Sequence, residues 1–202
     1  LQAALASGHP ILPLYIMEPN YWAKDSSSSR HWQFIRDCLI ELDSTLTALG
    51  QPLIFRIGEA IEIFTDLSKT YQISGIYAHQ ETGTGWTHER DKQIITSCRN
   101  AAIPFHEFPS NGVVRRLNDR DKWGAIRAKR MQEPLIAAPQ SLQSIGPCPS
   151  DRLPEPSNAI IRNQISGRTQ KGGRKSAQRL LAAFLSDKAQ GYLPHISKPG
   201  QA

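Results

Sequence analysis

The first 110 residues alternate between short, continuous apolar runs and longer stretches in which apolar residues recur every three or four positions. The continuous runs have the length and composition of strands that are buried on both faces. They lie at residues 11–17, 52–57, 73–78 and 103–108. The stretches with helical spacing are residues 30–49, 59–71 and 86–101. Strands that alternate with helices across short connections predict an α/β fold, with a Rossmann-like parallel sheet flanked by helices.

The pattern changes beyond residue 110. We expect a basic helix over residues 118–131, followed by a Pro- and Ser-rich stretch, 133–158, that is typical of an extended linker. A last amphipathic helix is predicted over residues 174–188. The chain therefore divides into an α/β domain over 1–131, an inter-domain linker over 132–170 and the start of an all-α domain over 171–202.

The two parts of the chain differ in charge. Residues 1–110 contain 8 Lys and Arg against 12 Asp and Glu, whereas residues 111–202 contain 16 against 6. Such asymmetry favours a polyanion as partner of the basic part. A solvated linker and helix face would give the same composition, so both interpretations stay open.

Several classes of protein are disfavoured. The three cysteines, Cys38, Cys98 and Cys148, are too few and too widely spaced for a complete disulfide framework or a four-cysteine metal site, and they suit a reducing, cytoplasmic location. No run of 18 apolar residues is present, so we expect no membrane association. No histidine has metal-ligand spacing, and we assign no metal site and no catalytic residue. The adjacent charges Glu89, Arg90, Asp91 and Lys92 favour a solvated helix face.

Several blocks of sequence, in this order, resemble the photolyase/cryptochrome family. They are ILPLYIMEP, SRHWQFIRDCLIELDSTLTALG, PLIFRIGEAIEIFTDLSKTY, GIYAHQETGTGWTHERD, IPFHEF, GVVRRLNDRDKW, GGRKSAQRLLAAFL and GYLPHISKP. The resemblance covers that family's N-terminal α/β domain, the linker and the first helix of its flavin domain.

The resemblance implies a five-stranded sheet with a central first strand, which this chain lacks. The missing strand is expected between residues 11–17 and 73–78, and the chain is expected to be a fragment of a longer protein. Two buried strands would then have no shared neighbour, so we expect the fragment to be poorly stable or to aggregate.

The same resemblance implies a function for the full-length protein. It is a FAD-dependent, blue-light-driven DNA photolyase, a carbon–carbon lyase of the deoxyribodipyrimidine photo-lyase type, in which reduced FAD passes an electron to a pyrimidine dimer. Its partners are damaged DNA and its own helical FAD domain, and it is expected to be a monomer. The fragment alone is expected to be inactive. The alternatives are a cryptochrome-type blue-light photoreceptor without repair activity, or a stand-alone nucleotide-binding α/β domain.

Candidate cofactor residues follow from the resemblance. Tyr192 stands where the family often has a tyrosine at the flavin phosphates, although packing at a helix end would also explain it. His79, Gln80, Glu81 and Trp86 follow a strand at the crevice that holds an antenna chromophore of unknown identity in several members. Polar groups could bond a ring edge and Trp86 could stack on it, but a structural loop or domain interface is the alternative.

Two basic clusters complete the candidates. Arg115, Arg116, Arg120 and Lys122 follow the last strand, and Arg168, Lys171, Arg174 and Lys175 stand at the end of the linker. Either cluster could bind DNA phosphates by charge. For the first we favour an interface with the helical domain, and for the second solvated charge or charge that clamps the linker.

Overall fold

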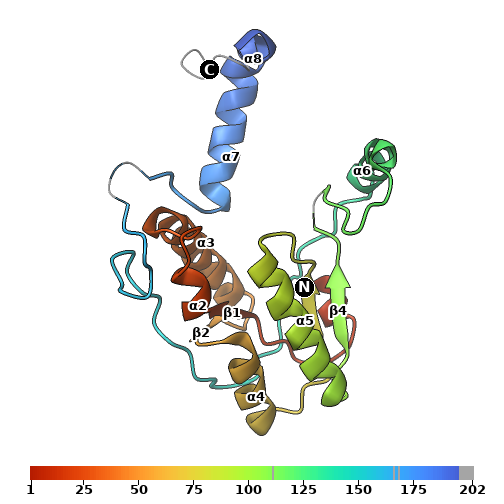
Figure 1. Ribbon diagram of the computed structural model, residues 1–202, viewed down its shortest axis with the longest axis vertical. Helices are drawn as coiled ribbons and strands as arrows, with labels where there is room; N and C mark the ends of the chain where they lie inside the picture. The colour runs from red at the N-terminus through yellow and green to blue at the C-terminus, as the bar shows by residue number, and fades with distance from the viewer. Residues whose placement is uncertain (111, 166, 168, 196–202) are drawn as a thin grey trace.

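The computed structural model describes the chain except for Asn111, Ser166, Arg168 and residues 196–202. Four short strands alternate with three long helices along the first 110 residues (Figure 1). The strands are β1 (Leu14–Met17), β2 (Ile54–Ile57), β3 (Ile76–His79) and β4 (Phe105–Phe108). The helices between them are α3 (Ser29–Ala48), α4 (Ala60–Thr70) and α5 (Gly85–Asn100). This order confirms the predicted alternation of strands and helices.

The strands form two separate parallel pairs. β1 pairs with β2, with Leu14 opposite Ile54, and β3 pairs with β4, with Ile76 opposite Phe105. No strand among the described residues joins β1 to β3. The parallel pairing was predicted, whereas a single Rossmann-like sheet is not what these residues form by themselves.

The first strand was predicted to begin at residue 11, which is too early. β1 begins at Leu14, after Pro10 and Pro13, which have no backbone N–H to donate to a ladder. Two four-residue helices flank this strand, α1 (Gln2–Leu5) before it and α2 (Pro19–Trp22) after it. The short helix α2 begins at a proline, which is well suited to the first helical turn.

The larger core cluster lies between the β1–β2 pair and α3. Ser28 caps α3, its hydroxyl accepting from the His31 backbone N–H, and the helix then buries Trp32 completely. The buried members of this cluster are Met17, Trp22, Trp32, Leu39, Phe55 and Ile161. Because Ile161 belongs to the predicted linker, that segment is part of the core and not only a spacer.

A smaller cluster lies under the β3–β4 pair. Its buried members are Ala60 of α4 with Ile94 and Cys98 of α5, and Ile76 and Phe105 of the strands pack against them. Both strand pairs are thus covered by helices, but the second cluster has fewer buried side chains.

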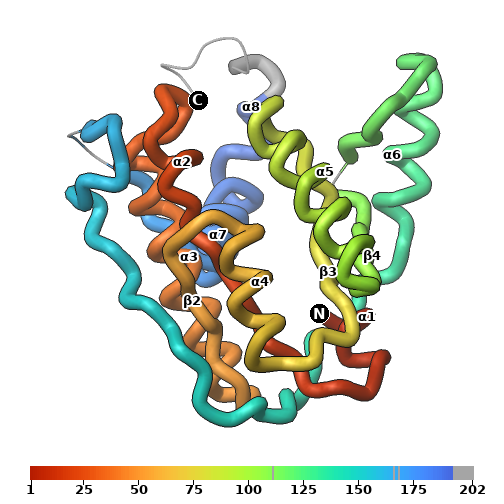
Figure 2. The backbone as a smooth tube through the Cα atoms, turned by 60° about the horizontal axis from the view of Figure 1, so that its bottom comes forward, coloured from red at the N-terminus to blue at the C-terminus, as the bar shows by residue number. Residues whose placement is uncertain are grey.

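The linker runs along the outer edge of β2 without forming a helix or strand of its own in its described part (Figure 2). The Asp151 N–H donates to the Phe55 carbonyl at 2.7 Å, and the Ile57 N–H donates to the Asp151 carboxylate at 2.8 Å. On the face of α3 that packs on the strands, the Trp32 indole N–H donates to the Pro154 carbonyl at 2.9 Å. The linker therefore satisfies the backbone groups of an edge strand.

The remaining helices project from this body (Figure 1). A 3-10 turn, η1 (Arg120–Lys122), leads into α6 (Trp123–Met131). The last helical part comprises α7 (Arg174–Ala183), a π-helical segment η2 (Phe184–Lys188) and α8 (Ala189–His195), so it continues beyond the predicted end at residue 188. Among the described residues, no helix has both the length and the apolar character needed to cross a bilayer.

Candidate functional site

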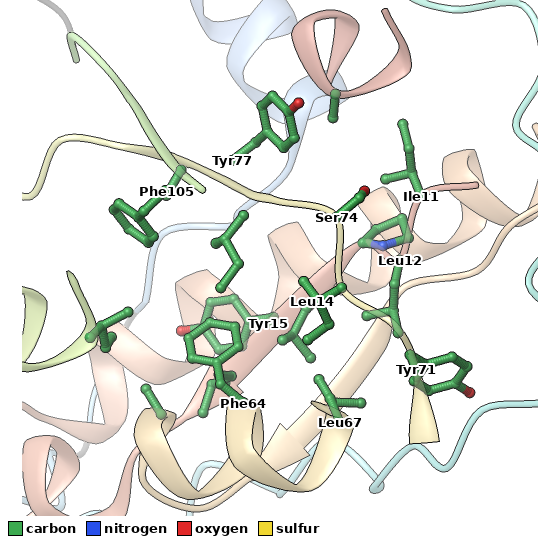
Figure 3. Close-up of a pocket in the computed structure, with 18 of the residues that line it drawn as sticks. Ile11, Leu12, Leu14, Tyr15, Phe64, Leu67, Tyr71, Ser74, Tyr77 and Phe105 are labelled. Carbon is green, nitrogen blue, oxygen red and sulfur yellow. The ribbon is translucent and has the colours of Figure 1, made fainter. Parts of the chain in front are cut away.

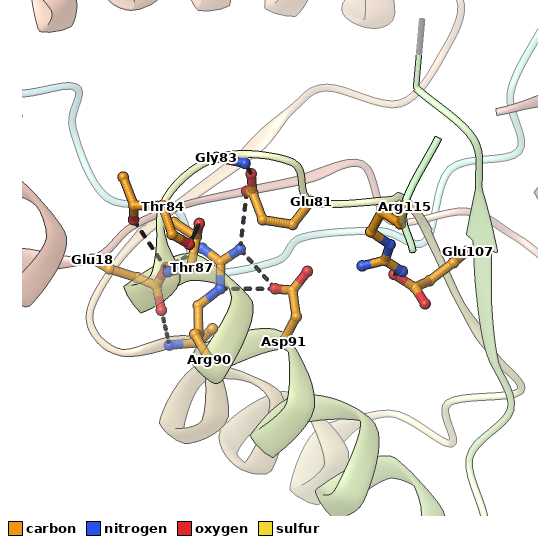
Figure 4. A network of polar contacts seen from close by, with 10 residues as sticks. Glu18, Glu81, Gly83, Thr84, Thr87, Arg90, Asp91, Glu107 and Arg115 are labelled. Atoms are coloured by element: carbon orange, nitrogen blue, oxygen red, sulfur yellow. Dashed lines mark hydrogen bonds and ion pairs between the residues drawn. The ribbon is translucent and has the colours of Figure 1, made fainter. Parts of the chain in front are cut away.

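The carboxyl ends of β1 and β3 share one polar network (Figure 4). Glu18 directly follows β1, Glu81 lies in the loop after β3, and Arg90 and Asp91 lie on α5. Arg90 Nη1 is 2.6 Å from Glu18 Oε2, and Arg90 Nη2 is 2.8 Å from Asp91 Oδ1 and 3.5 Å from Glu81 Oε2. One guanidinium therefore links two strand ends that do not pair with each other.

Glu18 is the most buried member of this network, with 5% of its surface exposed. Its other oxygen, Oε1, accepts from the Ala60 N–H at 3.1 Å and so occupies the amino-terminal end of α4. Burial raises the pKa of Glu18 above its ordinary value, although the hydrogen bond and charge of Arg90 act in the opposite direction. Burial alone would lower the pKa of Arg90, but the carboxylates of Glu18 and Asp91 raise it.

The loop between β3 and α5 is fixed by its own polar contacts. Glu81 Oε1 accepts from the Gly83 N–H at 2.5 Å. The Thr84 hydroxyl caps α5 by accepting from the Thr87 N–H, and the Thr87 hydroxyl donates to the Thr84 carbonyl at 2.8 Å. A preformed loop of this kind holds Glu81 against Arg90.

Trp86 packs beside this network. Its ring centroid is 5.6 Å from that of Tyr21. Lys24 Nζ and Arg90 Cζ lie 5.5 and 5.9 Å from the Trp86 centroid, within the range of cation–π attraction. The indole predicted to stack on an antenna chromophore therefore already has three protein neighbours in this structure.

A cavity of about 1100 Å³ lies between β1 and β3 (Figure 3). Its walls are largely apolar, and Glu18, His79, Glu81, Arg90 and Asp91 form its polar end. Of the four residues predicted for the antenna crevice, His79 and Glu81 line this cavity, whereas Gln80 and Trp86 do not. Gln80 instead extends the ladder, its backbone N–H donating to the Phe108 carbonyl at 2.8 Å.

The prediction that Glu89–Lys92 form a solvated helix face holds for two of the four residues. Glu89 and Lys92 form an exposed ion pair one turn apart. Asp91, however, is only 8% exposed, and Arg90 reaches the buried Glu18. Sequence reasoning therefore missed Glu18, Arg90 and Asp91 as members of the site.

The first basic cluster is mostly exposed. Arg115 Nη2 lies 2.6 Å from Glu107 Oε1 on β4, so its charge is paired within the α/β domain. Arg116 adopts a positive φ of 57°, and Lys122 Nζ lies 3.6 Å from Asp119 Oδ2. Arg120 is the first residue of η1, and it is exposed.

The second basic cluster meets an acidic face of α3. Lys171 Nζ lies 3.8 Å from Asp37 Oδ2, and the Lys175 backbone N–H donates to Glu41 Oε1 at 3.0 Å. Arg174 is exposed at the start of α7, and Arg168 lies outside the described residues. The Lys171 contact is compatible with charge that clamps the end of the linker, one of the two roles favoured from sequence, whereas Lys175 makes its contact through the backbone.

Gly172 fits tightly at this junction. Its N–H donates to Asp37 Oδ2 at 3.2 Å, and a Cβ on Gly172 would collide with the Phe34 carbonyl oxygen. A residue with a side chain would force α7 away from α3 at this point.

Tyr192 lies on α8 and packs edge to face on Phe184, with ring centroids 5.4 Å apart. Its contact in the described chain is therefore the helix-end packing that was the alternative to a flavin role. Within the part of the chain that the structure describes, no three His, Cys, Asp or Glu side chains group in a way that could hold a metal ion.

Comparisons with known proteins identify relatives. The chloroplastic/mitochondrial cryptochrome DASH of Solanum lycopersicum is 32% identical over 88 residues, which are 41% of this chain and 15% of that protein. The structure is similar to that of a Synechocystis sp. PCC6803 cryptochrome, with a TM-score of 0.74, 18% identity and coverage of 96% of this chain and 44% of that one.

An archaeal photolyase from Sulfolobus tokodaii, solved with two FAD molecules, is similar with a TM-score of 0.58 and 18% identity, over 88% of this chain and 41% of that one. The chain thus spans less than half the length of each of these relatives. The model of the family described as DNA photolyase matches residues 1–141. The chain therefore belongs to the DNA photolyase family, the photolyase/cryptochrome family that its sequence blocks resemble.

Proposed function

We propose that this chain serves as the N-terminal α/β part of a FAD-dependent, blue-light-driven DNA photolyase. The family match over residues 1–141 is the observation that carries the proposal. The similarity to the archaeal photolyase with two FAD molecules supports the choice of cofactor. In the whole protein, bound FAD supplies the light-driven electron that splits a pyrimidine dimer in DNA.

The α7–α8 region offers little to an FAD molecule by itself. Tyr192 is the one residue of the α7–α8 region that was predicted to contact the flavin, and its ring packs on Phe184. A dinucleotide needs several convergent polar groups in a concave site, which this exposed helix does not offer. We therefore assign FAD binding and the repair chemistry to the full-length protein. The role of this chain would be to support the FAD site through the junction of α3 with α7.

The chain's own contribution to light harvesting is assigned to the polar end of the cavity. His79 and Glu81 line that end, and Arg90 fixes Glu81 at 3.5 Å. These groups could bond the polar edge of an antenna chromophore that sits at the cavity mouth. The exposed Arg116 and Arg120 remain candidates for an interface with the helical domain or for DNA phosphates.

A cryptochrome-type photoreceptor is the second candidate. One observation favours it: the sequence relative reported above, at 32% identity, is named a cryptochrome. Photoreceptor and repair enzyme would share this α/β part and differ in the flavin domain.

The test is to express the coding region of this chain together with its flanking reading frame and to assay the purified product. We expect a yellow flavoprotein that removes cyclobutane dimers from UV-irradiated DNA in blue light and not in the dark. Bound FAD without light-dependent repair would support the photoreceptor instead. A product that binds no flavin but binds ATP tightly would contradict both and favour a nucleotide-binding domain.

A further inference from the structure

The long helix α3 uses two different faces. On one face, Trp32 and Leu39 are buried against the strand pair β1–β2. The second face consists of four residues at positions i, i+3, i+4 and i+7, namely Phe34, Asp37, Cys38 and Glu41. This second face contacts residues 171–175, where the linker ends and α7 begins.

The start of α7 has no cap of its own. The first N–H groups of a helix have no partner within the helix, and a Ser, Thr, Asp or Asn side chain at the N-cap usually accepts from one of them. The N-cap of α7 is Gly173, which has no side chain to do so. Glu41 Oε1 of α3 accepts instead from the N–H of Lys175, the second residue of α7, at 3.0 Å. A residue of one helix therefore caps another, and its negative charge lies at the positive end of the α7 dipole.

Asp37 holds the residue before this cap. Its side chain is 9% exposed, its Oδ2 accepts from the Gly172 N–H at 3.2 Å, and its Oδ1 accepts from Gln33 Nε2 at 3.0 Å. Lys171 Nζ lies 3.8 Å from Asp37 Oδ2, but the Lys171 side chain is 75% exposed, and exposed ion pairs contribute little. The main partner of Asp37 at this junction is therefore the backbone of Gly172.

Both glycines are needed for this close approach. A Cβ on Gly172 would collide with the Phe34 carbonyl oxygen, and a Cβ on Gly173 would meet the Glu41 carboxylate. Gly173 also has a φ of 100°, which residues with a side chain rarely adopt. Its N–H donates to Cys38 Sγ at 3.1 Å. A side chain at either position would move the start of α7 away from α3.

The rest of α7 has little support from the α/β domain. Ser176, in its first turn, is the buried residue of this helix, whereas Leu180 and Leu181 are more than half exposed. The helix projects from the body of the molecule (Figure 1). Within the described chain, the direction of α7 is therefore set by the contacts of residues 171–176.

We propose that Asp37 and Glu41 are positioning residues, which cap α7 from α3 and so fix the direction in which the C-terminal helical part leaves the α/β domain. We call Asp37, Glu41, Gly172 and Gly173 the interhelical cap. In the whole protein, the cap would hold the FAD-binding part in one orientation relative to the α/β domain. This last step rests on the proposed function, whereas the direction of α7 does not.

The first test measures the direction of α7 in the 202-residue chain by NMR. Residual dipolar couplings of the backbone amides should fit one fixed orientation of α7 relative to α3 in the parent. Glu41→Ala removes the acceptor and Gly172→Ala introduces the collision, so in both variants the α7 couplings should shrink while those of α3 stay unchanged. Glu41→Ala should also speed exchange of the Lys175 amide about tenfold, since a hydrogen bond to a charged group is lost.

Matched variants separate capping from charge. Glu41→Gln keeps an acceptor oxygen and should preserve the direction of α7. Lys171→Ala removes only an exposed charge, and Glu62→Ala removes an exposed carboxylate on α4, so neither should change the α7 couplings or the Lys175 exchange. Should Gly172→Ala fail to fold, Glu41→Ala still decides the question, because it only shortens a half-buried side chain.

The second test places the same substitutions in the product of the coding region with its flanking reading frame. Glu41→Ala and Gly172→Ala should raise the Kd for FAD about tenfold, because the binding parts are no longer held in one arrangement. Glu41→Gln should restore the parent value, and Lys171→Ala should leave it unchanged.

Two results would overturn the proposal. One is an unchanged direction of α7 in both Glu41→Ala and Gly172→Ala. The other is a freed α7 with an unchanged Kd for FAD, which would show that the cap does not position the flavin site. A product of the flanking reading frame that binds no FAD in any variant would contradict the proposed function and the step that rests on it, while the couplings would still decide whether the cap directs α7.

Discussion

The two edges of the β1–β2 pair differ in what covers them. At the outer edge, the linker supplies Ser150 and Asp151, which bond the backbone of Phe55 and Ile57. At the inner edge, β1 faces a cavity of about 1100 Å³ that no described strand occupies. An irregular segment can therefore complete a sheet edge as well as a strand does, provided that its polar groups match.

The difference extends into the core. Ile161 of the linker is buried with Trp32 and Phe55 on the covered side. On the side of the cavity, the buried cluster is smaller, and Phe64 and Leu67 line the cavity (Figure 3). We therefore expect the covered side to contribute more to the free energy of unfolding than the cavity side does.

The largest expected effect on the free energy of unfolding is a difference between substitutions of two phenylalanines. Phe55 is 3% exposed and stacks on Tyr15 with ring centroids 5.9 Å apart, so Phe55→Ala should cost about 3–5 kcal/mol. Phe64 lines the cavity, so Phe64→Ala removes fewer contacts and should cost about 1–2 kcal/mol. Urea unfolding followed by far-UV circular dichroism measures both. Equal losses would show that the cavity side is packed as tightly as the covered side.

The next largest effect on the free energy of unfolding is a difference between substitutions of two basic residues on α5. Arg90→Ala leaves the buried Glu18 without its cation and should cost about 3 kcal/mol, as for other broken buried pairs. Lys92→Ala removes only an exposed pair with Glu89 and should cost less than about 0.5 kcal/mol. The same unfolding measurement compares them. A small loss for Arg90→Ala would mean that Glu18 is solvated and that the polar end of the cavity is not closed.

Much of the fold could be predicted because local patterns agree with it. The continuous apolar run that became β1 and the three- and four-residue spacing around Trp32 and Leu39 each indicated one type of element. The path of the linker could not be predicted. Its contacts, such as Pro154 with Trp32, depend on backbone carbonyls that carry no sequence signal.

The site was predicted only in part for a related reason. The loop after β3 was found because ligands bind at strand ends in α/β sheets. The buried face of α5 was missed because two of its four members are polar, namely Thr87 and Asp91 beside Ile94 and Cys98. Their spacing of four, three and four residues was a usable signal, and it places Asp91 inward and Glu89 outward.

A smaller effect tests the covered edge itself. Ser150 Oγ accepts from the Phe55 N–H at 3.0 Å, so Ser150→Ala should cost about 1 kcal/mol and speed exchange of the Phe55 amide. Ser144 serves as the matched control, since its hydroxyl accepts from the exposed Gly146 N–H and not from a strand. Hydrogen exchange read by mass spectrometry reports the β2 segment in both variants. Unchanged exchange in Ser150→Ala would show that the linker does not hold this edge.

The smallest effect is a pH dependence at the polar end of the cavity. Because burial raises the pKa of Glu18, the folded state binds a proton more readily than the unfolded state. Stability from this group is therefore present at low pH and falls as pH rises from the ordinary pKa of a glutamate to the raised value. The fall should be shallow, since Arg90 offsets much of the burial cost. Thermal melts across that range should show a flatter pH profile for Glu18→Gln than for the parent chain. A profile in which the parent gains stability with rising pH, relative to Glu18→Gln, would mean that Arg90 outweighs burial and that the carboxylate is held ionised.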